Sequence, residues 1–254
     1  MRILITNDDG YEAPGLLALY QALAPLGELA VVAPFEEQST RGHAVSFRDP
    51  VAVDWIEHEV FGRTGVVRGY PADCVRIALA AMRHPPFDWV ISGVNAGANL
   101  GVDAFYSGTV AAAREAALLS HRAVAVSQLF SAELPIDWSR TVYWTRRVLE
   151  DVLARPREAK TFWSVNLPAL SGADRPRHVR TVRLSTDPVP IIYDVSPDGQ
   201  PQRELYRYRG VYHERAVTPG TDVEAVFAGD IAVTPIHLDA TCPTHEDTHY
   251  VFEG

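Results

Sequence analysis

The sequence is poor in cysteine and contains no long apolar run. Among its 254 residues only Cys74 and Cys242 are cysteines. Two cysteines are too few for a disulfide scaffold and are typical of a reducing compartment, although one bridge between them stays open. No apolar stretch approaches the roughly 20 residues that span a bilayer, and no basic segment followed by an apolar one opens the chain. We therefore expect a cytoplasmic protein without a membrane partner.

Positive charge is also scarce. The 23 basic residues face 32 acidic ones, which gives a formal net charge of -9 and argues against binding to nucleic acid or to an anionic membrane. The single lysine, Lys160, follows no glycine-rich loop, so a Walker-type phosphate loop is excluded. The dinucleotide fingerprint G-x-G-x-x-G is missing after the first predicted strand. A small anionic substrate can still bind through a metal ion.

The first ten residues lead an apolar strand into two adjacent carboxylates. Ile3 to Ile5 form a continuous apolar run, as in the centre of a parallel sheet, and Asp8, Asp9 and Gly10 follow. The two carboxylates converge only if the chain is already turning there, which Gly10 permits. Their repulsion is relieved by a divalent cation, and oxygen ligands favour Mg²⁺, Mn²⁺ or Ca²⁺. The alternative is a plain turn, since these residues are common turn formers.

Beyond Gly10 the apolar pattern alternates between helices and strands, which predicts a parallel α/β sheet. We expect helices from residue 14, over 71–82, over 137–153 and from 221, strands over 29–33, 88–92, 123–127, 162–167 and 230–239, and a small antiparallel excursion over 51–55 and 60–68. Connections that leave the carboxyl ends of parallel strands lie on the same edge of the sheet. The polar loop over 34–47, with Ser39, Arg41 and His43, therefore lies on the Asp8 side.

The loop over 92–109 is rich in glycine, amides and hydroxyls, including Asn95 and Asn99. Its last residues, Ser107, Gly108 and Thr109, lead directly into a strong helix-forming segment. The free backbone amides and the dipole of a helix make its N-terminus a binding site for phosphate. An ordinary capped helix after a long loop is the alternative. A long structureless loop in a compact domain is usually functional, which favours the binding site.

The amino-acid composition of the last third of the chain differs from that of the part before it. Prolines and arginines become frequent after residue 168, and the segment 203–209 alternates arginine and tyrosine behind a turn signal at 197–199. RNA binding is conceivable for such a pattern, but the acidic total argues against it. We expect an extended arm that packs on a neighbouring subunit. His245 and His249 in the tail are residues of a type that binds metals, although a solvated terminus is the simpler interpretation.

Several ordered motifs together resemble the SurE survival-protein family. They cover roughly the first half of the chain, with one more match near its end: residues 3–10, Val32-Ala33-Pro34 with Ser39, 71–75, 92–95 through Gly101, 106–112, and Thr234-Pro235. The resemblance implies a Rossmann-like three-layer α/β core with a mostly parallel sheet and an extended C-terminal β arm used in oligomerisation. It also implies homodimers or homotetramers with a swapped C-terminal segment.

The resemblance further implies a 5′-nucleotidase, a metal-dependent phosphomonoesterase that acts on nucleoside 5′-monophosphates and often also on 3′-nucleotides or polyphosphate. One divalent cation per subunit, Mg²⁺ or Mn²⁺, would be held by Asp8, Asp9, Ser39 and Asn95. Phosphate would be bound by Asn99, Ser107, Gly108 and Thr109. Two residues depart from the family pattern: Thr40 replaces a frequent glycine, and Tyr70 replaces a usual threonine beside the phosphate pocket.

We interpret the chain as a single domain over 1–254. The α/β core would comprise 1–170 and 220–240, the oligomerisation arm 171–219 and the tail 241–254. Asp8 and Asp9 would be the catalytic residues, orienting or deprotonating a metal-bound water. A covalent aspartyl phosphate is the enzymatic alternative, but enzymes of the haloacid-dehalogenase type separate their two aspartates by one residue. The non-enzymatic alternative is a sensor or scaffold that binds nucleotide or phosphate without turnover.

Overall fold

Six parallel strands form the centre of a nine-stranded sheet in the order β3-β4-β2-β1-β5-β6-β7-β11-β8. This computed structural model describes residues 1–82, 85–172, 174–197, 199 and 203–241. The parallel strands are β1 (Arg2–Thr6), β2 (Glu28–Pro34), β4 (Gly62–Val67), β5 (Trp89–Ala96), β6 (Arg122–Gln128) and β7 (Thr161–Leu167). Three strands near the edges run in the opposite direction: β3 (Val53–His58), β11 (Ile231–His237) and β8 (Val179–Thr181).

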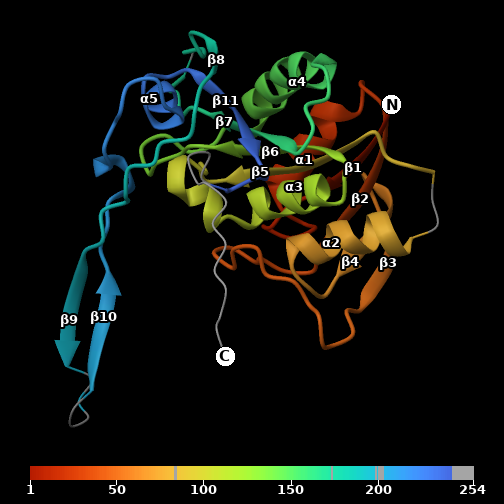
Figure 1. Cartoon of the computed structure of the whole chain (residues 1–254), viewed down its shortest axis with the longest axis horizontal. Helices are drawn as coiled ribbons and strands as arrows, with labels where there is room; N and C mark the ends of the chain where they lie inside the picture. The colour runs from red at the N-terminus through yellow and green to blue at the C-terminus, as the bar shows by residue number, and fades with distance from the viewer. Residues whose placement is uncertain (83–84, 173, 198, 200–202, 242–254) are drawn as a thin grey trace, which may run out of the picture.

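Helices cover both faces of this sheet, so the core has three layers (Figure 1). The first face carries α1 (Pro14–Leu23) and α4 (Trp138–Ala154), which pack with the sheet around Leu19, Leu149 and Ile5. The second face carries α2 (Pro71–Arg76) and α3 (Gly108–Leu118), which contribute Cys74 and Val110. The predicted Rossmann-like core with a mostly parallel sheet is confirmed, and Cys74 is a buried free thiol within it.

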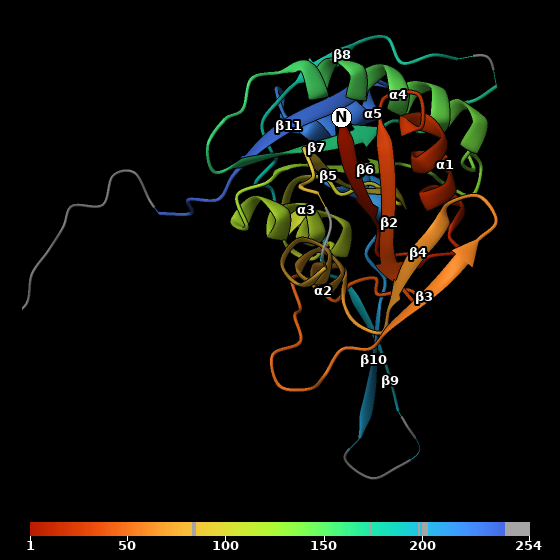
Figure 2. The ribbon, with the colours of Figure 1, turned by 90° about the vertical axis from the view of Figure 1, so that its right-hand side faces the viewer.

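The C-terminal part returns to the sheet after a projecting hairpin. Strands β9 (Tyr193–Pro197) and β10 (Glu204–Tyr208) form a separate two-stranded sheet that points away from the core (Figures 1 and 2). A short 3₁₀ turn (Tyr212–Glu214) and α5 (Asp222–Phe227), capped by Thr221, then lead into β11. Because β8 pairs with β11, part of the segment 171–219 belongs to the main sheet, and β9 and β10 are the strands of that segment that project from the core.

Three predicted segments differ in detail from the structure. The antiparallel pair predicted over 51–55 and 60–68 forms as β3 and β4, but β4 also pairs in parallel with β2 as part of the main sheet. The helix over 71–82 changes to π-helical geometry over Ile77–Ala81. The loop over 92–109 is partly regular, because β5 continues to Ala96 and a 3₁₀ helix forms over Gly101–Phe105. Part of the turn signal at 197–199 and the tail histidines, with Cys242, lie outside the described residues. In the described part of the chain, no helix is both long and apolar enough to cross a membrane.

Candidate functional site

The predicted site residues meet where β1 and β5 lie side by side. The chain leaves β1 toward α1 on one face of the sheet and leaves β5 toward α3 on the other face. Such a reversal opens a crevice at the carboxyl ends of the strands, where doubly wound sheets bind their ligands. Asp8 and Asp9 follow β1, and Asn95 lies near the end of β5. The backbone N–H of Ala96 donates to Asp9 Oδ2 over 3.4 Å, which joins the two strand ends.

Asp8 is buried against the first turn of α3. Its side chain accepts a hydrogen bond from the hydroxyl of Thr109, and only 3% of the residue is exposed. A Cβ atom on Gly108 would lie 2.8 Å from both Cβ and Oδ2 of Asp8, so only glycine permits this close approach. Ser107 caps the helix by accepting from the backbone N–H of Val110 over 3.1 Å. The start of α3 therefore points its amides and its positive dipole end at the carboxylates.

The pKa values of both aspartates are raised, mainly by burial and in part by neighbouring carboxylates. Burial raises the pKa of Asp8, and hydrogen bonds from the side chain and backbone of Thr109 oppose the rise only in part. Burial and the charge of Asp8 raise the pKa of Asp9 to about 7. The charge of Glu37 adds to the rise in both. Sequence reasoning missed Glu37, although the polar loop that carries it was placed on the correct side of the sheet.

The oxygen atoms around this pair fit a hard divalent cation. Asn95 donates its amide to Gly97 O over 2.6 Å, and its Oδ1 has no hydrogen-bond partner in the described residues. The Ser39 hydroxyl also makes no hydrogen bond there, and its loop is fixed because Gln38 N donates to Asp8 O over 2.7 Å. Two carboxylates with neutral amide and hydroxyl oxygens form a donor set for Mg²⁺ or Mn²⁺. The described residues contain no cluster of three or more His, Cys, Asp or Glu side chains arranged for a metal.

The predicted phosphate ligands divide into two places. Ser107, Gly108 and Thr109 lie at the start of α3 beside Asp8. Asn99 instead lies over the carboxyl ends of β6 and β7, where its amide donates to Ser127 Oγ over 2.7 Å and its backbone N–H donates to Asn166 Oδ1 over 2.8 Å. Its side chain is thus engaged within the protein, and its role toward phosphate stays a prediction.

A buried polar network holds the loop between Asn99 and Ser107. Arg215 Nη1 lies 2.5 Å from Asp103 Oδ2, and Arg215 Nη2 donates to Leu100 O over 3.1 Å. Asp222 accepts the backbone N–H of Gly101 over 2.7 Å and that of Ser185 over 2.8 Å. These partners lie more than 80 residues from the loop in sequence, so no local pattern could reveal them.

His43 belongs to a second network, farther along α3. Its Nε2 lies 2.7 Å from Glu115 Oε2, and Arg76 Nε donates to Glu115 Oε1 over 2.6 Å. Burial alone would raise the pKa of Glu115, but the hydrogen bonds from His43 and Arg76 lower it overall. Since Glu115 lies nearly two turns beyond Thr109 on α3, His43 ties the polar loop to the helix rather than to the carboxylates.

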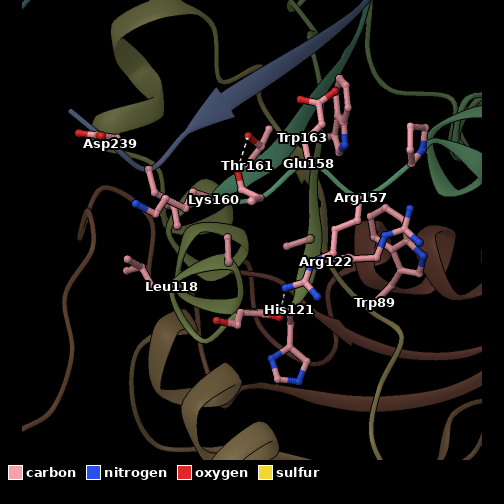
Figure 3. Close-up of a pocket in the computed structure, with 16 residues that line it drawn as sticks. Trp89, Leu118, His121, Arg122, Arg157, Glu158, Lys160, Thr161, Trp163 and Asp239 are labelled. Atoms are coloured by element: carbon pink, nitrogen blue, oxygen red, sulfur yellow. Dashed lines mark hydrogen bonds between the residues drawn. The ribbon is translucent and has the colours of Figure 1, made fainter. Parts of the chain in front are cut away.

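A cavity of about 640 Å³ lies at the other end of the parallel strands, where their amino ends meet. It is bordered by the beginnings of β5, β6 and β7, and Figure 3 shows Arg122 and Arg157 near Trp89 on one side with Lys160 on the other. The guanidinium of Arg122 stacks on the Trp89 ring at 4.0 Å. A full strand length separates this cavity from Asp8 and Asp9, so it takes no part in the site.

Comparisons with known proteins agree with this geometry. Residues 3–188 match the family model described as Survival protein SurE. A protein of Syntrophobacter fumaroxidans named 5′-nucleotidase SurE is 40% identical, and the match covers 95% of each chain. A protein of the same name from Heliobacterium modesticaldum is 38% identical over 95% of this chain and 88% of its own length. The crystal structure of the SurE protein from Aquifex aeolicus superposes with a TM-score of 0.82 at 31% identity, covering 95% of both chains.

Proposed function

Because this chain belongs to the SurE family, we propose that it is a divalent-metal-dependent 5′-nucleotidase that hydrolyses nucleoside 5′-monophosphates to nucleoside and phosphate. The relatives named 5′-nucleotidase SurE support the reaction class. The observation that carries the metal dependence is the pair of Asp8, which is buried beside the start of α3, and Asp9, which is half-buried. In the described residues, the side-chain oxygens of the neighbouring Asn95 and Ser39 accept no hydrogen bond. Nucleoside 3′-monophosphates and short polyphosphate are further substrates of the proposed enzyme.

In the proposed hydrolysis, different residues of the site bind the metal ion, orient the attacking water and bind the phosphate. A bound Mg²⁺ or Mn²⁺, one per subunit, would supply Lewis-acid chemistry and favour ionisation of a water. Asp8 and Asp9, with Asn95 and Ser39, would hold the ion, and the carboxylates orient the attacking water. The amides at the start of α3 and the hydroxyl of Ser107 bind the phosphate oxygens and stabilise their growing charge. The leaving alkoxide takes its proton from solvent.

Phosphate release from a panel of nucleoside monophosphates tests this function. With Mg²⁺ or Mn²⁺ we expect turnover, and EDTA should lower it by at least about a hundredfold, because several kcal/mol of charge stabilisation depend on the ion. Adding the metal back in excess should restore the rate. Nucleotide binding without turnover under every condition would contradict the proposal and favour a sensor or scaffold. An aspartyl hydroxamate formed when hydroxylamine is added during turnover, with release of phosphate from the acyl phosphate, would instead favour the covalent aspartyl route.

The projecting hairpin supports the proposal that the enzyme is a homo-oligomer. In its register Tyr193 pairs with Tyr208 and Val195 with Tyr206, so these four side chains share one face. All four are exposed, and an isolated two-stranded sheet is only marginally stable in water. Covering this face with a second copy of the chain would stabilise it. The cytoplasmic location stays a prediction from the low cysteine content.

The oligomer can be tested by changing one face of the hairpin at a time. We expect Val195→Glu to lower the molecular mass in solution toward that of the monomer, because a charge would be buried in the interface. Light scattering after gel filtration measures this mass. Arg207→Glu on the opposite face serves as the control and should leave the assembly in place. Equal masses for wild type and Val195→Glu would show that this face of the hairpin is not the contact.

A further inference from the structure

A second cavity, of about 330 Å³, lies beside the carboxylate site at the same edge of the sheet. Its walls come from the ends of β2 and β4 and from the start of α2, and they include Phe35, Glu36, Gln38, Ser46, Arg68 and Tyr70. Its volume is within the range of small-molecule pockets. The catalytic proposal for Asp8 and Asp9 uses none of these side chains.

The loop over 36–38 belongs to both places. The backbone N–H of Gln38 donates to Asp8 O over 2.7 Å, while the residue also lines the cavity. Strand β2 separates β4, which borders the cavity, from β1, which carries the carboxylates. Two strand spacings amount to about 10 Å, which is comparable with the length of a nucleoside monophosphate. A substrate with its phosphate at Asp8 can therefore reach the cavity with its other end.

The walls have the chemistry that recognises a flat, neutral, polar ring. The guanidinium of Arg68 lies 4.1 Å from the centre of the Phe35 ring and pairs with Asp54 at 3.0 Å. Tyr70 adds a second aromatic side chain. Bases stack on aromatic and guanidinium planes in this way. Glu36 also lines the cavity and would repel a phosphate, so the charged end of the substrate belongs at the carboxylate site with its cation.

Polar groups that can read the edge of a ring are present and partly free. The side-chain amide of Gln38 makes no hydrogen bond within the described residues and offers both donors and an acceptor. Ser46 is fixed by Asp73, which accepts from its backbone N–H over 2.9 Å and from its hydroxyl over 2.8 Å. The same carboxylate accepts the backbone N–H of Tyr70 over 3.0 Å, so both walls are held in place.

We propose that this cavity binds the nucleobase of the substrate and that Tyr70 and Gln38 provide its main contacts. The proposal rests on the proposed nucleotidase function and deepens it, because it assigns the part of the substrate that phosphate chemistry alone cannot select. Tyr70 provides the stacking surface, and Gln38 reads the polar edge of the base.

The test compares a nucleoside monophosphate with ribose 5-phosphate, which carries the same phosphate and sugar but no base. For Tyr70→Ala we expect the ratio of kcat/KM for the purine nucleotide to kcat/KM for ribose 5-phosphate to fall between about 5-fold and 100-fold, the range that loss of base stacking produces. Tyr70→Phe should keep the ratio. Tyr143→Ala, at an exposed tyrosine on α4, is the matched control and should keep it as well.

The outcomes separate this inference from the nucleotidase function. An unchanged ratio for Tyr70→Ala, with wild type active on both substrates, would overturn the base-binding cavity while leaving the phosphatase in place. If wild type hydrolyses neither substrate, the nucleotidase function fails. In that case calorimetric titration with the free nucleoside tests whether the cavity binds the base. Binding that is weakened by Tyr70→Ala supports base binding in the cavity. Equal binding to both proteins, or binding to neither, overturns it.

Discussion

Replacing Asp8 by asparagine is expected to lower metal-dependent phosphate release by at least about a thousandfold and to leave the fold intact. Asparagine has nearly the same shape and can still accept the hydroxyl hydrogen bond of Thr109. It removes one of only two carboxylates that the predicted metal ligands provide. A thousandfold loss of rate corresponds to an increase of about 4 kcal/mol in the activation free energy. This increase is within the several kcal/mol of transition-state stabilisation that a catalytic metal supplies.

The same substitution should make the protein more stable when no metal is present. Asp8 is buried beside Asp9 and close to the charge of Glu37, and its pKa is raised in the folded state. A raised pKa means that folding favours the protonated form, so the ionised carboxylate costs stability as the pH rises through the folded pKa. Asparagine removes that cost. The gain in melting temperature should be present at neutral pH and disappear in acid, where Asp8 is protonated in both states.

Melting curves in EDTA and in Mn²⁺, together with phosphate release, check both effects. Asp151→Asn on the exposed side of α4, where Asp151 pairs with Arg155 over 2.7 Å, is the control for loss of one negative charge. We expect Mn²⁺ to stabilise wild type and the control but not Asp8→Asn. Undiminished turnover by Asp8→Asn would remove Asp8 from the proposed metal site.

The site residues that the sequence predicts lie beside local sequence signals, whereas those it does not predict are placed by contacts between distant segments. Asp8, Asn95 and Ser107 each stand next to a strong local signal, the end of an apolar strand or the start of a helix. Parallel strands bring such ends to one edge of the sheet, so topology alone joins them. The three-layer core was predictable for the same reason, since strands and helices alternate in the sequence.

The missed features depend on contacts between distant segments. Glu37 acts on the carboxylates from a loop that the hydrogen bond from Gln38 N to Asp8 O holds beside them. Asn99 was predicted as a phosphate ligand from its glycine-rich surroundings, but its engagement by Ser127 and Asn166 requires β6 and β7 in place. A run of small polar residues shows that a loop is special. It does not show which side chains are already used by the protein itself.

Arg215 provides the second large effect, because it neutralises the partly buried carboxylate of Asp103 on the loop that leads into the phosphate-binding turn. Only 4% of Arg215 is exposed, and it contacts Asp103 Oδ2 and Leu100 O. In Arg215→Met, Asp103 keeps the hydroxyl of Tyr212 at 2.9 Å but loses its counter-charge. Removing one partner of a buried pair usually destabilises a protein by about 3–5 kcal/mol, and we expect the lower value because 18% of the Asp103 side chain is exposed.

Urea unfolding of Arg215→Met, Asp103→Asn and the double variant measures this coupling. The double variant should be more stable than Arg215→Met, because it carries no uncompensated buried charge. Losses that simply add in the double variant would contradict a direct coupling. In conditions where Arg215→Met is folded, its kcat/KM for nucleoside monophosphates should fall by about tenfold, since the loop over 99–107 loses its contacts with Arg215 at Leu100 and Asp103.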